Sequence, residues 1–137
     1  MSESNPNVYE LGKMTIFYIP SHKLDDPAYY RQDDDRDSAS SVSPARMPTA
    51  RAGIHEFLID HFRAYTQTPT PVKGCWVDPT GRLVHDVMER FEVSFANEGD
   101  FERLIGFLVE TCRRMDEEAI YVTRGDRSFL VHRGGKA

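Results

Sequence analysis

The chain has 137 residues, of which 39% are hydrophobic and 28% charged, a composition typical of one globular domain. Its formal net charge of −5 disfavours direct nucleic-acid binding, which depends on lysine and arginine against the phosphates. No apolar run reaches the roughly 18 residues of a membrane-spanning helix, and residues 1–9 lack an apolar signal segment. We therefore expect a soluble, cytoplasmic domain over residues 13–133, with a flexible N-terminus over 1–12 and a tail over 134–137.

The first expected element is a strand over residues 13–20, because this stretch is rich in β-branched and aromatic side chains and stops at Pro20. Residues 21–48 follow, with a run of aspartates, a serine-rich stretch and two late prolines. So long a connection within a compact domain is typically functional or disordered. We expect a partly disordered loop that is largely dispensable for folding, with Tyr29 and Tyr30 as candidate anchors.

A helix is expected next, from about Ala50 to Tyr65 with Thr49 as its N-cap, because apolar residues recur there at helical spacing. The prolines of residues 68–71 should end it. Residues 72–77 and 83–95 are then expected to pair as an antiparallel hairpin around a Pro–Gly turn. The second strand alternates apolar with polar residues, which is typical of a half-buried strand.

A second helix over residues 101–117, capped by residues 97–100, and strands over 119–123 and 128–132 complete the expected order. The order β-α-β-β-α-β with one extra C-terminal strand predicts an α+β, ferredoxin-like fold, an antiparallel sheet with two helices on one face. Phe91 and Leu104 should face each other in its core.

The opposite face of the sheet would then be open. Phe17 or Tyr18, Trp76 or Val77, and Val84 with Met88 are expected there. An apolar patch of that size usually marks an interface, and two-fold pairing lets it meet itself, so we expect a homodimer. The alternative is that the long loop folds back over the sheet.

The C-terminal half contains several short turn and strand motifs, namely Pro69-Thr-Pro, Gly74-Cys-Trp76, Asp78-Pro-Thr-Gly81 and Glu117-Glu-Ala-Ile-Tyr-Val122. In this order they resemble an uncharacterised bacterial family of small ferredoxin-like proteins. The resemblance implies a ferredoxin-like fold. It implies no activity, because the family has no settled activity, and therefore no catalytic residue is carried over to this chain. Its members are typically exported, whereas this chain shows no export signal.

Candidate catalytic residues lie in the second strand of the hairpin. On an uninterrupted strand Glu89 and His85 share the face of the core aromatics. Glu89 could then act as a general base in a pocket, together with His85 and with Tyr18 or Arg90. Alternatively, a β-bulge near residues 88–89 turns both side chains to solvent. We favour the bulge, because buried acids are rare unless they are paired.

Other constellations carry no recognisable chemistry. Asp33, Asp34 and Asp35 are contiguous and lack the spacing and glycine of a calcium loop, so we interpret them as a solvated acidic loop. The five histidines form no metal-ligand motif, and the two cysteines are expected to be packed, reduced thiols. Nucleotide-binding glycine motifs and nucleophile motifs are absent. We therefore expect no metal and no cofactor.

The leading functional hypothesis is a small non-catalytic binding or regulatory protein that acts through protein–protein contacts, for example an accessory or anti-defence inhibitor of a mobile element. Its binding surface would comprise Trp76, Tyr29, Tyr30, Asp33, Asp34 and Asp35. The alternative is a small cofactor-independent enzyme that uses the candidate catalytic residues. A Glu89 side chain buried beside a cavity would favour the enzyme, and an exposed one the binding protein.

Overall fold

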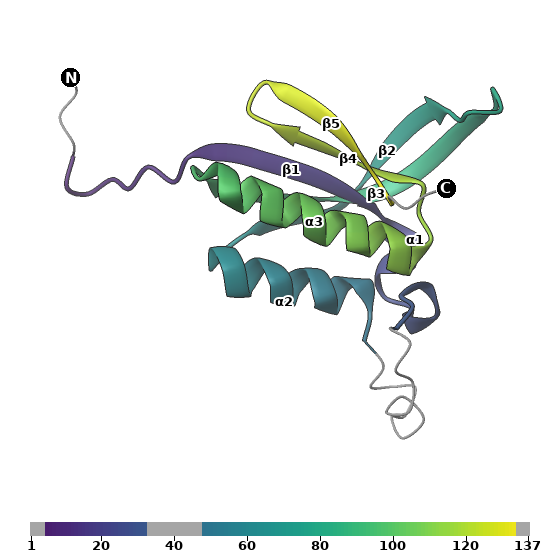
Figure 1. Ribbon diagram of the computed structural model, residues 1–137, viewed down its shortest axis with the longest axis horizontal. Helices are drawn as coiled ribbons and strands as arrows, with labels where there is room; N and C mark the ends of the chain where they lie inside the picture. Colours follow the sequence, from purple (N-terminus) through teal and green to yellow (C-terminus); the bar gives the residue numbers. More distant parts are fainter. Residues whose placement is uncertain (1–4, 33–47, 134–137) are drawn as a thin grey trace.

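The computed structural model describes residues 5–32 and 48–133, which form an α+β fold. Its strands make one five-stranded sheet in the order β2-β3-β1-β4-β5, and every neighbouring pair is antiparallel. The strands are β1 (Lys13–Pro20), β2 (Thr66–Val77), β3 (Leu83–Phe95), β4 (Ala119–Arg124) and β5 (Arg127–His132). The helices are α1 (Ser21–Leu24), the 3₁₀ turn η1 (Pro27–Tyr29), α2 (Ala50–Phe62) and α3 (Glu98–Met115). Both long helices lie on the same side of the sheet (Figure 1).

The N-cap expected at Thr49 is confirmed, whereas α3 begins at Glu98, three residues before the expected start, with Asn97 as its N-cap. The Thr49 hydroxyl accepts the backbone N–H of Ala52 at 3.1 Å, and the Asn97 side chain accepts that of Gly99 at 2.7 Å. Helix α2 ends at Phe62, three residues before the expected end, because Arg63 adopts a left-handed conformation with φ of 70°. Among the helices of the described ranges, none is long and apolar enough to cross a membrane.

Strand β2 begins earlier than the sequence predicts and includes Pro69 and Pro71, which we expected to lie in a loop before it. The strand tolerates both prolines because it is an edge strand, and the register against β3 is interrupted between Thr68 and Val72. The irregularity of this hairpin therefore lies in β2. The bulge that we favoured in β3 near residues 88–89 is wrong, since β3 keeps a continuous register with β1.

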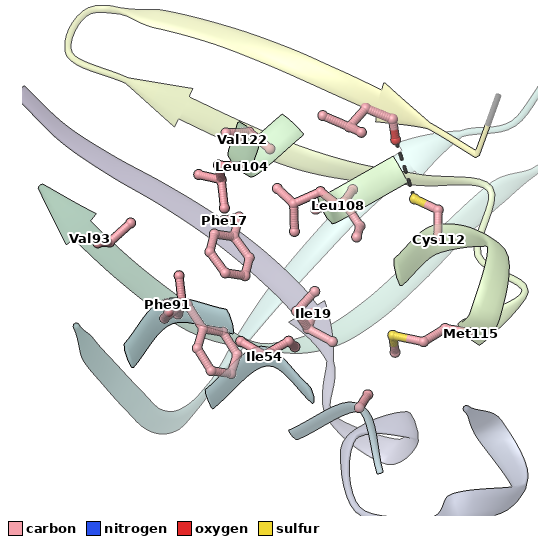
Figure 2. Close-up of a cluster of buried hydrophobic side chains, with 14 of the residues drawn as sticks. Phe17, Ile19, Ile54, Phe91, Val93, Leu104, Leu108, Cys112, Met115 and Val122 are labelled. Atoms are coloured by element: carbon pink, nitrogen blue, oxygen red, sulfur yellow. Dashed lines mark hydrogen bonds between the residues drawn. The ribbon is translucent and has the colours of Figure 1, made fainter. Parts of the chain in front are cut away.

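The core fills the space between the sheet and the two long helices (Figure 2). Phe17 of β1 and Phe91 of β3 stack there with ring centroids 5.3 Å apart. Leu104 of α3 is fully buried in the same core, so both expected core residues lie on the predicted face. The Cys112 thiol, also buried, donates to the carbonyl of Val131 at 3.5 Å and links α3 to β5.

The first part of the predicted loop differs from the expectation. Residues 21–29 form α1 and η1, and the Leu24 side chain is fully buried in the core. Tyr30 is buried as well, whereas Tyr29 is partly exposed. The backbone N–H of Arg31 donates to the Arg114 carbonyl at 2.9 Å, which attaches this segment to the end of α3. Leu24 escaped the sequence analysis because one leucine in a polar stretch carries no periodicity. Asp33, Asp34 and Asp35 lie outside the described residues.

Candidate functional site

The helix-free face of the sheet carries the aromatic side chains that strand alternation directs away from the core. Tyr18 of β1 and Tyr121 of β4 lie side by side there, with ring centroids 6.0 Å apart. Trp76 of β2 is on the same face, opposite Val84 in the strand register. The β2–β3 and β4–β5 hairpins both extend away from the helices (Figure 1), and β1 lies between them in the strand order. As predicted, the helices cover one face and leave these aromatics uncovered.

A cavity of about 370 Å³ lies on this open face, between the two hairpins. Its size falls at the lower end of the range of about 300–1,000 Å³ that is usual for small-molecule sites. Its walls are mostly apolar and aromatic, with a few polar groups, as such sites require. The lining comprises Tyr18, Pro20, Val72, Lys73, Gly74, Cys75, Trp76, Asp86, Met88, Glu117, Ala119, Tyr121 and Leu130. We call this the open-face cavity.

Two carboxylates line the open-face cavity, and each has a defined partner. The Trp76 indole N–H donates to Asp86 Oδ2 at 3.0 Å across the β2–β3 pair. Glu117, just beyond α3, forms an ion pair with Lys23 Nζ at 2.5 Å. Lys23 also donates to the Met115 carbonyl at 3.0 Å, so the end of α3 holds its ammonium in place. Since Lys23 neutralises Glu117 and Lys73 also lines the cavity, Asp86 is the carboxylate that could attract a positively charged, flat ligand beside the aromatic walls.

Glu89 does not belong to this cavity. Its side chain is 12% exposed, on the helix side of β3, and pairs with Arg51 of α2 at 3.2 Å. Gln67 of β2 also donates to it. Arg51 binds Asp25 as well, at 2.7 Å, and this hydrogen bond holds the pKa of the Asp25 carboxyl below its usual value. Glu89 is therefore a paired carboxylate that ties α2 and β2 to β3.

The four candidate catalytic residues are divided between the two faces. Alternation along β3 places His85 with Glu89, and His85 Nδ1 lies 3.3 Å from Cys75 Sγ on the neighbouring strand. Arg90 is on the open face, opposite Tyr18 in the register, and pairs with Glu92 at 3.0 Å. Of the four, only Tyr18 lines the open-face cavity.

The candidate binding residues are likewise separated. Trp76 lines the open-face cavity, whereas Tyr29 and Tyr30 lie near α1 and the end of α3, where Tyr29 contacts His22 and Tyr30 lies under the Arg114 guanidinium. The sequence analysis missed Tyr121 and Asp86. Tyr121 alternates with two buried residues in β4, a pattern from which its exposure could have been inferred. Asp86 had no comparable signal, since an acid near a hairpin end is ordinarily solvated.

Metal binding finds no support in this geometry. No group of three or more histidine, cysteine or acidic side chains lies close enough to hold an ion within the ranges 5–32 and 48–133. This leaves the apolar, aromatic open-face cavity as the principal candidate site.

Comparison with known proteins shows a structural likeness to a solved protein. No protein-family profile and no curated protein matches the sequence, so the resemblance to the uncharacterised bacterial family stays a prediction. The fold is similar to that of a solved phage SAM lyase in complex with S-methyl-5′-thioadenosine, with a TM-score of 0.52. The likeness covers 94% of this chain and 96% of that chain at 10% sequence identity. At this identity it shows a shared fold only.

Proposed function

We propose that this protein is an enzyme that binds S-adenosylmethionine in the open-face cavity and breaks a carbon–sulfur bond, releasing S-methyl-5′-thioadenosine. The observation that carries the proposal is the cavity itself, which joins aromatic walls and carboxylates in a fold shared with a SAM lyase. The proposal replaces the non-catalytic hypothesis as our leading one, since no comparison supports a binding protein.

The aromatic side chains suit the nucleoside half of the ligand. Stacking of a base on an aromatic side chain contributes about 1–3 kcal/mol, and Tyr18, Tyr121 and Trp76 all line the cavity. Tyr121 is 45% exposed, so a ligand can reach its ring without displacing core side chains. We expect adenine to pack against these rings.

The carboxylates suit the sulfonium. A cation is stabilised by aromatic faces and by nearby carboxylates. Asp86 lines the same cavity as the three aromatic side chains. The product thioether is neutral and loses both attractions. The site should therefore hold the charged substrate more tightly than the product of cleavage.

The chemistry needs no cofactor, because the sulfonium is itself a good leaving group. The electron pair of the broken carbon–sulfur bond goes to sulfur, which leaves as a neutral thioether. The released γ-carbon forms its new bond to the carboxylate oxygen of the same substrate, which closes a lactone. The cleavage consumes no water, no external proton and no oxidant. The contribution of the protein is then to bind the tail in a reactive conformation.

We further propose that the fold is ferredoxin-like, with β5 as the added edge strand. The support is the order β2-β3-β1-β4 with helices α2 and α3 in the two crossovers. We retain the expectation that the protein acts in the cytoplasm.

The test is to incubate the protein with S-adenosylmethionine and follow S-methyl-5′-thioadenosine by chromatography, against a protein-free blank. We expect formation above the blank, and calorimetric binding of S-methyl-5′-thioadenosine. Tyr121→Ala should weaken that binding at least about fivefold through the lost stacking. The matched control is Tyr29→Ala, since Tyr29 is 40% exposed and does not line the open-face cavity. Absence of both turnover and binding would refute the proposal.

A further inference from the structure

A second cavity, of about 460 Å³, lies where β1 passes into α1 beside the β2–β3 hairpin. We call it the side cavity. Its lining comprises Pro20, Ser21, His22, His85, Asp86 and Val87. Its character differs from that of the open-face cavity, because it has no aromatic wall other than two imidazoles and is rich in hydrogen-bonding side chains. It therefore suits a small polar group rather than a base.

The two cavities adjoin each other. Pro20 and Asp86 line both of them, so Asp86 stands at their junction. The Trp76 indole holds the Asp86 carboxylate from the side of the open-face cavity, at 3.0 Å. A ligand that filled the open-face cavity and reached the side cavity would have to pass Asp86, and a positive centre in its middle would then lie beside that carboxylate.

Ser21, which lines the side cavity, has a hydroxyl that is left without a partner among the described residues. Ser21 Oγ is buried and makes no hydrogen bond to any of the described residues. Buried polar atoms are nearly always satisfied, and an exception calls for an explanation such as an absent ligand. The two imidazoles are positioned by other contacts, since His85 Nδ1 is 3.3 Å from Cys75 Sγ and the His22 ring packs edge-on against Tyr29.

We propose that the side cavity binds the amino-acid tail of the substrate, with its carboxylate accepting hydrogen bonds from Ser21, His22 and His85. This rests on the proposed function, because the nucleoside must occupy the open-face cavity. The sulfonium then sits beside Asp86 at the junction. A serine hydroxyl and two imidazoles can all donate to a carboxylate, and the same contacts turn that carboxylate toward the γ-carbon that it attacks.

The test separates the tail from the rest of the ligand. S-Methyl-5′-thioadenosine has no tail, whereas S-adenosylhomocysteine has the full tail and a neutral, unreactive sulfur. We expect calorimetry to show S-adenosylhomocysteine binding about tenfold or more tightly, since hydrogen bonds to a charged group are strong. Ser21→Ala and His85→Gln should each shrink that preference severalfold and leave binding of S-methyl-5′-thioadenosine unchanged. His55→Gln, on α2 and outside both cavities, is the matched control.

The outcomes are distinct. If S-methyl-5′-thioadenosine does not bind, the proposed function fails. If S-methyl-5′-thioadenosine binds and S-adenosylhomocysteine binds no more tightly, the tail assignment is overturned. It is also overturned if Lys73→Met, in the lining of the open-face cavity, abolishes the preference for S-adenosylhomocysteine while the Ser21 and His85 variants keep that preference. Because His85 is exposed, H85Q should fold even if S21A does not, and a thermal melt of each variant checks this.

Discussion

The two faces of the sheet both carry aromatic side chains but use them differently. On the helix side Phe17 and Phe91 stack at 5.3 Å and are shut away from solvent. On the open side Tyr18 and Tyr121 lie 6.0 Å apart beside a cavity. Tyrosine suits the open position, because its ring offers an apolar surface while its hydroxyl tolerates water. The alternation of a single strand, β1, thus contributes to a stabilising core on one side and to a candidate binding surface on the other.

The largest expected difference between the faces is in stability. Phe91→Ala should lower the free energy of unfolding by about 3–5 kcal/mol, because it removes a buried, stacked ring and leaves a cavity. Tyr121→Ala should cost less than about 1 kcal/mol, because its side chain is partly solvated already. Denaturant unfolding measures both. Equal costs for the two variants would contradict the division of roles between the faces.

A second comparison concerns the segment that follows β1. Leu24→Ala should cost about 2–5 kcal/mol, since the side chain is fully buried in the core. Replacing residues 33–47 with a short Gly/Ser linker should cost little, because closing a shorter loop is entropically cheap. Thermal unfolding distinguishes the two. A Leu24→Ala variant as stable as the parent would restore the original expectation that residues 21–48 are largely dispensable for folding.

The two thiols offer a comparison that leaves the fold intact. Burial raises the pKa of the Cys112 thiol to about 12, while the Cys75 thiol, which we expected to be packed, is exposed beside His85. At pH 8 an alkylating reagent should therefore modify Cys75 and spare Cys112, which mass spectrometry of the peptides would show. Because the folded-state pKa of Cys112 is raised, its contribution to stability is complete below about pH 8.5 and is lost as the pH rises toward 12. Rapid labelling of both thiols at pH 8 would contradict this assignment.

Trp76→Asp, on the open face at 37% exposure, should cost about 1 kcal/mol or more, because it removes the hydrogen bond to Asp86 and puts a second carboxylate beside it. We still predict that the protein self-associates through this face, so that self-association and ligand binding in the open-face cavity would compete for Trp76 and Tyr121. Light scattering of the parent should give a mass near twice 15.7 kDa, and the substitution should reduce it. A concentration-independent mass of 15.7 kDa for the parent would rule out the dimer.

Local patterns were enough to predict most of the fold. The period-2 alternation of Phe91, Val93 and Phe95 marked β3, and Thr49 marked the start of α2, while α3 was placed with its start three residues too late. These features depend on neighbours in the chain, so they can be read from it. The same alternation placed Tyr18 and Trp76 among the candidates for the open face.

The site depended on contacts that only the folded chain makes. Glu89 looked like a catalytic candidate, yet Arg51, 38 residues away in the chain, pairs with it on the helix side. The open-face cavity brings Tyr18 next to Tyr121, and the side cavity brings Ser21 beside His85. The amino-acid sequence by itself determined the long helices, most of the strands with their alternation, and the acidic character of the chain. Which polar residues are paired, and which face a cavity, was decided by the strand order, because it sets the neighbours of residues that lie far apart in the sequence.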